Sequence, residues 1–227
     1  MVLDLLLPQR CLGCSRSGPQ ICDACATRLQ RLGSALCARC GCPTAWPVAR
    51  CRECAGRRLA FGRARGAVAY DEPVRRIVAA WKERGLRRLA AWAADVVVEV
   101  VPRPDADVVG FVPPDRDRLL RRGHHAAEAL ARELGRRWEL PVEPLLARTR
   151  PAQRQRSLDH VERRRNVRGA FGAAATVRGR ILLVDDVYTT GATVNAAASA
   201  LRRAGARRVE VVTFARAIRR GTVCGAA

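Results

Sequence analysis

Lysine is almost missing from this chain, and long apolar runs are missing altogether. Of the 42 residues counted as Lys+Arg, only Lys82 is a lysine, and Tyr and Met are also scarce. No stretch is long and apolar enough to span a bilayer. The opening residues, MVLDLLLPQRC, contain neither a basic segment nor a small-residue cleavage site. These absences argue against a membrane-spanning or secreted protein, and we expect a cytoplasmic one.

The charge is one-sided. Lys+Arg number 42 against 21 for Asp+Glu, which gives a formal net charge of +21. A field of this sign attracts nucleic acid, phosphorylated metabolites or anionic membranes, without distinguishing between them. Abundant Arg, Ala and Gly with scarce Lys is also typical of a GC-rich genome, so the charge alone assigns no partner. With 48% hydrophobic residues, a chain of 227 residues is globular and long enough to bury a core.

Cysteine is concentrated at one end of the chain, with nine of the ten cysteines before residue 55. Eight of them form four Cys-x2-Cys pairs, namely Cys11 and Cys14, Cys22 and Cys25, Cys37 and Cys40, and Cys51 and Cys54. Each pair places two thiolates on one side of a tight turn, and two pairs complete a tetrahedron around Zn²⁺. The spacing therefore predicts one or two structural zinc ions. Sequential pairing gives 11/14/22/25 and 37/40/51/54, and an interleaved pairing stays open.

Two other uses of the cysteines fit the sequence less well. A disulfide framework needs an oxidising compartment, which the missing signal peptide argues against. A redox role suits one such pair better than four. The cysteine-rich segment has too little apolar sequence to fold unaided, so metal binding would supply much of its folding free energy. We predict a zinc domain over residues 1–58 and a second domain over 59–227, with Cys42 and Cys224 outside the metal sites.

Strands and helices alternate in the second domain. Apolar runs predict strands over residues 63–70, 107–112, 142–146, 181–184 and 209–214. Helical spacing predicts helices from Asp71 through Lys82 and over 86–100, 123–138 and 192–204, whereas the arginine-dense segment 148–165 is typical of a long loop that enters a short helix near Leu158. Such alternation is typical of an α/β fold, with a parallel sheet and helices on both faces.

The stretch ILLVDDVYTTGATVN, which begins at Ile181, carries the clearest chemical signal. Asp185 and Asp186 follow an apolar strand, at the sheet edge where such folds bind ligands. Two adjacent carboxylates suit the vicinal hydroxyls of a ribose, or a metal beside them. The turn that follows offers hydroxyls, backbone N–H groups and a helix N-terminus, which suit a phosphate. An ordinary strand–turn–helix needs only one Asp and one Thr, so the pattern favours a ribose 5-phosphate site.

This stretch resembles the phosphoribosyl pyrophosphate (PRPP) motif of the type I phosphoribosyltransferases. Residues 3–215 resemble the ComF family, in which a cysteine-knuckle zinc domain precedes a transferase domain. The supporting stretches are LLLPQRCLGC, LCARCGCP, the lysine of VAAWKERG, RRGHHAAEALA and QRSLDHVERRRNVRGAF. The resemblance implies a type I phosphoribosyltransferase-like fold, bound PRPP with Mg²⁺, and a link to natural competence and DNA uptake.

The resemblance also implies roles for individual residues. Asp185 and Asp186 would hold the ribose hydroxyls and, with Lys82, form the catalytic set. The 5-phosphate would lie against Thr189, Thr190, Gly191, Ala192 and Thr193, and the pyrophosphate would lie near the loop that contains Arg122. The arginine-rich segment 148–165 would form a hood that closes over the substrate, and it would contribute Gln155 and Arg163. The family usually has an aromatic residue and an Asn-Gln pair after Arg-Gly, whereas this chain has His124-His125-Ala126 after Gly123. We therefore expect His124 and His125 to start a helix at the surface.

Three functions fit these observations. The first is an enzyme that transfers a phosphoribosyl group to an undefined acceptor. The second is a non-catalytic factor that binds single-stranded DNA and works with DNA-uptake proteins, and the third is a PRPP sensor without turnover. Thr189 stands where enzymes that salvage 6-oxopurines usually carry an acidic residue, which disfavours hypoxanthine or guanine as the acceptor. Lys82 favours phosphate chemistry, because an ammonium binds phosphate as a compact point charge.

Overall fold

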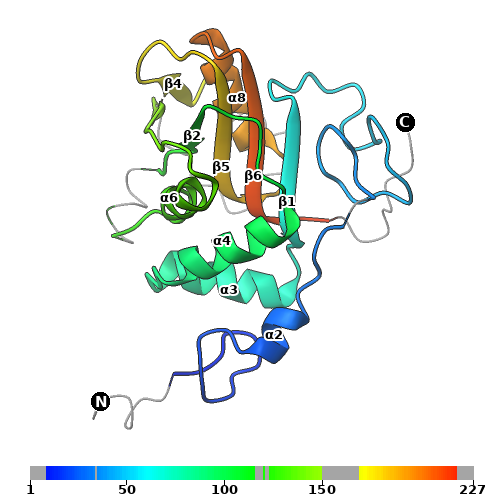
Figure 1. Ribbon diagram of the computed structural model, residues 1–227, viewed down its shortest axis with the longest axis vertical. Coiled ribbons are helices and arrows are strands. Elements are labelled where there is room, and N and C mark those ends of the chain that lie inside the picture. The colour runs from blue at the N-terminus through cyan, green and yellow to red at the C-terminus, as the bar shows by residue number, and fades with distance from the viewer. Residues whose placement is uncertain (1–8, 34, 116–119, 121–122, 150–168, 219–227) are drawn as a thin grey trace.

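The computed structural model describes residues 9–33, 35–115, 120, 123–149 and 169–218 (Figure 1). Its centre is a four-stranded parallel sheet in the order β1-β6-β5-β2. The strands are β1 (Arg63–Ala69), β2 (Val108–Phe111), β5 (Arg180–Tyr188) and β6 (Arg208–Arg216). Two short strands, β3 (Leu146–Arg148) and β4 (Phe171–Ala173), pair antiparallel beside it.

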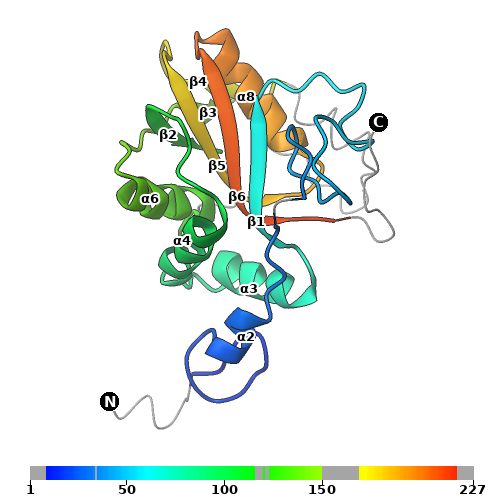
Figure 2. The same cartoon turned by 45° about the vertical axis from the view of Figure 1, so that its right-hand side comes forward.

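Helices cover both faces of the main sheet. Figure 2 shows α3 (Glu72–Glu83), α4 (Leu89–Val100) and α6 (Ala126–Trp138) on one side and α8 (Ala192–Arg203) on the other. Apolar side chains of the first three helices meet one face of β5 and β6 in one core, and α8 packs on the opposite face in a second core. The predicted α/β architecture with a parallel sheet is thus confirmed.

Helix α3 shows how the sequence fixes the helix that carries Lys82. The Asp71 carboxylate accepts a hydrogen bond from the Val74 N–H at 3.1 Å, which caps the first turn, and proline follows in that turn. Val74, Ile77, Val78 and Trp81 form the buried face. Trp81 anchors the last turn, because its ring meets Phe214 of β6 edge-on at 6.3 Å between centroids. Lys82 follows directly and is held at the sheet edge by this anchor.

The predicted elements differ from the structure at several boundaries. Strand β5 continues to Tyr188, so the acidic pair lies inside a strand and not after it. Of the expected strand over 142–146, Val142 forms a single bridge with Val109 and Leu146 begins β3, whose pairing with β4 was not predicted. Helix α2 (Asp23–Thr27) was also missed. The short helix expected near Leu158 lies outside the described residues.

The two cysteine-rich lobes lie on different sides of the fold. The first surrounds α2 and lies below α3, whereas the second lies beside β1 (Figures 1 and 2). Buried cysteines of the second lobe belong to the same apolar core as α8. The division of the chain after residue 58 stays a prediction. Among the described helices, none has the length and apolar character that crossing a membrane requires.

Candidate functional site

A cavity opens where strand β2 stops pairing with β5. Their last paired residues are Phe111 and Val184, whereas β6 stays paired with β5 as far as Tyr188. The released edge of β5 borders a cavity of about 330 Å³. Its walls come from β5, the end of α3, the segment after β2, and the first turns of α6 and α8. The cavity therefore lies at the C-terminal edge of the parallel strands, as the fold class predicts.

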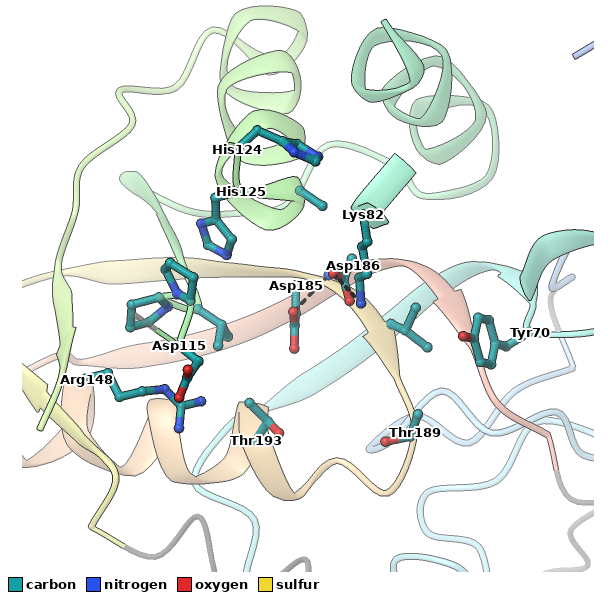
Figure 3. Close-up of a pocket in the computed structure, with 15 residues that line it drawn as sticks. Tyr70, Lys82, Asp115, His124, His125, Arg148, Asp185, Asp186, Thr189 and Thr193 are labelled. Carbon is teal, nitrogen blue, oxygen red and sulfur yellow. Dashed lines mark hydrogen bonds and ion pairs between the residues drawn. The ribbon is translucent and has the colours of Figure 1, made fainter. Parts of the chain in front are cut away.

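The two aspartates of β5 face different partners. The Asp186 carboxylate forms an ion pair with the Lys82 ammonium, with 2.7 Å between Nζ and Oδ2. Asp185 projects into the cavity above Thr193, and its Oδ1 accepts the N–H of Asp186 at 2.9 Å (Figure 3). Lys82 and both aspartates line the cavity. The structure thus brings together the three residues expected to form the catalytic set.

Burial and like charge act together on Asp185. The pKa of Asp185 is raised to about 7, mainly by burial and next by the charge of the neighbouring Asp186. The positive charge of Lys82 opposes this rise but does not cancel it. Burial alone would lower the pKa of Lys82, but the charges of Asp186 and Asp185 outweigh it, and the net direction is upward. Lys82 is therefore charged at neutral pH, whereas Asp185 titrates there. A carboxyl group that is costly to ionise gains from a cation or a hydroxyl donor in the cavity.

The turn between β5 and α8 has a tight, glycine-dependent shape. Gly191 has φ of 71°, and a Cβ there would lie 2.1 Å from the Tyr188 hydroxyl oxygen. Thr190 Oγ1 accepts the N–H of Ala192, the first residue of α8, at 3.3 Å, and Gly191 is the N-cap. Thr189 and Thr193 line the cavity. Glycine is required here both by the positive φ and by the tyrosine packed against it.

The two histidines do not lie where we expected. They stand at the start of α6, as predicted, but both are half-buried and line the cavity. The His125 ring meets Phe111 edge-on, with 5.8 Å between centroids. Burial lowers the pKa of His125 to about 4, against the opposing charges of Asp186 and Glu128. The imidazole is therefore neutral at pH 7 and offers a hydrogen bond without charge.

Other cavity residues were not singled out in the sequence. Tyr70 follows β1, Asp115 follows β2, and Arg148 ends β3 with its guanidinium 4.8 Å from the Phe171 ring centre. Each stands at or just beyond the end of a strand, and this position is the signal that could have found them. Arg122, Gln155 and Arg163, expected at the pyrophosphate and in the hood, lie outside the described residues.

The eight paired cysteines form two separate clusters. Cys11, Cys14, Cys22 and Cys25 make the first and Cys37, Cys40, Cys51 and Cys54 the second, with all ligand atoms of a cluster within 4.8 Å of one another. Sequential pairing is thereby confirmed over the interleaved alternative. None of the nine described cysteines is in a disulfide, so the disulfide alternative is wrong for them. Cys42 lies outside both sets, and Cys224 lies outside the described residues.

The geometry of both clusters fits Zn²⁺. Zn–S bonds of about 2.3 Å place tetrahedral ligands about 3.8 Å apart. The sulfurs of Cys37 and Cys54 are 3.6 Å apart, those of Cys40 and Cys51 also 3.6 Å, and those of Cys14 and Cys22 3.8 Å. Burial opposes ionisation of Cys11, but backbone N–H groups that point at its sulfur lower the pKa to about 6. The surrounding backbone thus favours the thiolate form of Cys11, whereas burial raises the pKa of Cys25 to about 12 and that of Cys54 to about 11.

Comparisons with known proteins agree with both halves of the chain. Residues 2–55 match the Double zinc ribbon domain, and residues 119–222 match the Phosphoribosyl transferase domain. The chain is 26% identical to Competence protein F of Haemophilus influenzae over 226 residues, covering 92% of this chain and 97% of that protein. It is 31% identical to DNA utilization protein YhgH of Salmonella typhi over 212 residues, covering 87% of this chain and 91% of that protein.

Among solved structures, the likeness is more distant. Glutamine PRPP amidotransferase from B. subtilis matches with 25% identity and a TM-score of 0.38, covering 56% of this chain and 25% of that one. The protein TT1426 from Thermus thermophilus matches with 19% identity and a TM-score of 0.34, covering 62% of this chain and 86% of that one. The sequence relations are therefore the stronger guide.

The two clusters predict the metal content. The purified protein should carry about two Zn²⁺ per chain, and Cys51→Ser should lower this to about one, because a structural site needs all four ligands. Elemental analysis of the full chain measures both values. Cys42→Ser is the matched control and should keep about two, since Cys42 is outside the four-ligand sets. Folded wild-type protein with less than about one zinc would contradict the assignment.

Proposed function

This chain belongs to the family of Competence protein F and DNA utilization protein YhgH, and from that premise we propose that its cavity binds PRPP with Mg²⁺ and transfers the phosphoribosyl group to an acceptor. The observation that carries the proposal is the placement of Asp185, Asp186 and Lys82 above the 188–193 loop. In this proposal the aspartates accept hydrogen bonds from the two ribose hydroxyls. The loop and the N-terminus of α8 receive the 5-phosphate.

The donor set suits a magnesium ion that arrives with the ligand. Mg²⁺ prefers oxygen ligands, and proteins often hold it through one or two carboxylates and the phosphates of the substrate. Asp185 and Asp186 are adjacent carboxylates, and the ionisation of Asp185 is opposed by burial and by Asp186. A bound divalent cation relieves that repulsion and neutralises charge on the pyrophosphate. Both aspartates would hold the ion or the ribose hydroxyls beside it.

The proposed reaction needs no nucleophile from the protein. The bond from ribose C1 to the pyrophosphate oxygen breaks, and the pyrophosphate keeps the electron pair. A lone pair of the acceptor forms the new bond to C1. The cavity contributes by holding the sugar in place and by presenting charges that suit a cationic ribose and an anionic leaving group. Lys82 fixes Asp186 through the 2.7 Å contact, so the carboxylate is already oriented when the sugar arrives.

A second function is favoured by charge and by the relatives. The net charge is +21, and the relatives carry the names Competence protein F and DNA utilization protein. We propose that the chain also binds single-stranded DNA through phosphate contacts and acts with DNA-uptake proteins in the cytoplasm. Release of pyrophosphate separates the enzyme from a PRPP sensor without turnover. Salt-sensitive DNA affinity tests the binding role separately.

Removing the acidic pair should abolish most PRPP affinity. Replacing Asp185 and Asp186 together by Asn keeps their shape and removes two charge-assisted hydrogen bonds, so affinity should fall roughly 10²-fold. Calorimetric titration with PRPP and Mg²⁺ measures the loss. Asp105→Asn with Asp107→Asn is the matched control, because these carboxylates pair with Arg180 at the opposite end of the strands. Unchanged affinity in the first double variant would remove the main support for the proposal.

The pKa of Asp185 predicts how PRPP affinity depends on pH. Since its pKa is raised to about 7, the carboxyl group is protonated at lower pH and accepts hydrogen bonds poorly. Affinity should therefore weaken as pH falls, by roughly ten-fold at one unit below the pKa relative to the plateau above it. Titrations at pH 6, 7 and 8 follow the change. The Asp185→Asn variant shows how much of the pH dependence comes from titration of PRPP itself, and its affinity should change less with pH than that of the wild type. An equally steep dependence of affinity on pH in this variant would argue against Asp185 as the titrating group.

Single-stranded DNA should bind with strong salt dependence. Non-specific electrostatic binding predicts dissociation constants on the order of micromolar at about 50 mM salt, weakening steeply as salt is added. Fluorescence anisotropy with a labelled oligonucleotide measures the slope. The Asp185 and Asp186 double Asn variant should keep this affinity, since it removes no positive charge. Absent binding at low salt, or binding indifferent to salt, would contradict the DNA role.

A further inference from the structure

Arg216 is a buried arginine between the second cysteine cluster and the loop of the proposed phosphate site. It is the last residue of β6, it lies beside Tyr188 in the parallel register, and only 1% of its surface is exposed. A cation is rarely buried so deeply unless its partners are fixed around it. The contacts of its guanidinium group therefore indicate what it holds in place.

One side of the guanidinium binds the second cysteine cluster. Nη1 donates to the Cys40 carbonyl oxygen at 2.7 Å, and Nη2 lies 3.7 Å from the Cys40 sulfur. Nη2 also donates to the Glu53 carboxylate at 3.0 Å, and Glu53 lies between two ligands of the same cluster, Cys51 and Cys54. The planar guanidinium thus contacts both Cys-x2-Cys pairs of this cluster at once, which a single ammonium does not do.

The flat face of the guanidinium meets the loop through Tyr188. The Arg216 Cζ atom lies 4.3 Å from the centre of the Tyr188 ring. Tyr188 is itself buried, and its hydroxyl lies directly against Gly191, where a Cβ would come within 2.1 Å. The ring therefore supports the turn from behind, and Arg216 fixes the ring by stacking on it.

A second arginine links the same lobe to the same loop. Arg57 follows the last ligand of the second cluster, and its Nη2 donates to the Thr190 carbonyl oxygen at 2.9 Å. Next to it, the Ala60 N–H donates to Asn195 Oδ1 in α8 at 2.7 Å. The second lobe thus contacts the loop from behind the turn and at its backbone.

We infer that Arg216 is a positioning residue through which the second cysteine cluster fixes the 188–193 loop, with Arg57 as a supporting link. The loop's part in binding the 5-phosphate rests on the proposed function, whereas its link to the cluster does not. The first cluster offers a contrast. Arg76 of α3 donates to the Gly13 carbonyl at 2.9 Å, in a lobe far from the loop (Figure 1).

The test compares Arg216→Gln and Arg57→Gln with Arg76→Gln as the matched control, all in the full zinc-loaded chain. Hydrogen exchange of the peptide over residues 188–193 reports the loop directly, without any ligand. Zinc content is measured in parallel, and calorimetry with PRPP and Mg²⁺ reports binding. Exchange over β2 and α6 serves as the internal reference, because a general loss of stability would raise exchange there as well.

We expect faster exchange confined to the loop in both test variants, unchanged zinc, and PRPP affinity lower by about ten-fold for Arg216→Gln. Arg76→Gln should match wild type. Loop protection equal to wild type in Arg216→Gln would overturn the inference, and so would faster exchange spread evenly over β2 and α6. If Arg216→Gln does not fold, Arg57→Gln decides, since Arg57 is only partly buried. Wild type that binds no PRPP contradicts the proposed function but leaves the exchange test intact.

Discussion

The ion pair between Lys82 and Asp186 is the contact on which the arrangement of the site depends. Two adjacent carboxylates inside a strand repel each other, and burial adds to the cost of ionising them. Lys82, 2.7 Å from Asp186, compensates one of these charges and leaves Asp185 with a pKa of about 7. The strand, the end of α3 and the Trp81 anchor that holds Lys82 must all be in place for the pair to form. Asp185 then remains a carboxyl group whose ionisation its surroundings oppose, and such a local cost in stability is typical of functional sites.

The two zinc lobes have different structural consequences, although their sequences look alike. In the first, Cys14 is exposed and Cys22 and Cys25 are half-buried, whereas every ligand of the second is buried. The second also shares the apolar core of α8, and Gly41 between its knuckles lies against β1, where a Cβ would meet the Ala64 carbonyl oxygen at 2.4 Å. Metal bound in the second lobe would therefore stabilise the sheet and, by the inference above, the 188–193 loop. Metal bound in the first would instead hold the segment from which Leu12 and Ile21 pack against the core of α3, α4 and α6. Counting knuckles gives no sign of this difference, because it arises from what each lobe packs against.

The sequence was a good guide wherever local rules decide the structure. Cysteine spacing predicted both clusters, alternation predicted the parallel sheet, and the Asp71 cap with its proline predicted the start of α3. It was a poor guide where a contact joins distant segments. His124 and His125 look like a surface helix start because nothing nearby in the chain shows that Phe111 and the acidic pair face them. Arg216 looks like one more arginine at the end of a strand, since its partners Cys40 and Glu53 lie more than a hundred residues away in the chain.

The choice of cation at two positions follows from geometry. Most basic residues here are arginine, which by itself tells little, because composition alone could produce it. At residue 216 the guanidinium uses what only arginine has: two donors that reach a carbonyl and a carboxylate, and a flat face on an aromatic ring. At residue 82 the space beside Asp186 receives one compact ammonium, in the wall of the cavity that we propose admits a sugar and its phosphates. A guanidinium there would extend further and could bind the carboxylate with two parallel bonds, leaving fewer free acceptors for ribose hydroxyls. The single lysine is thus best explained by the cavity that it borders.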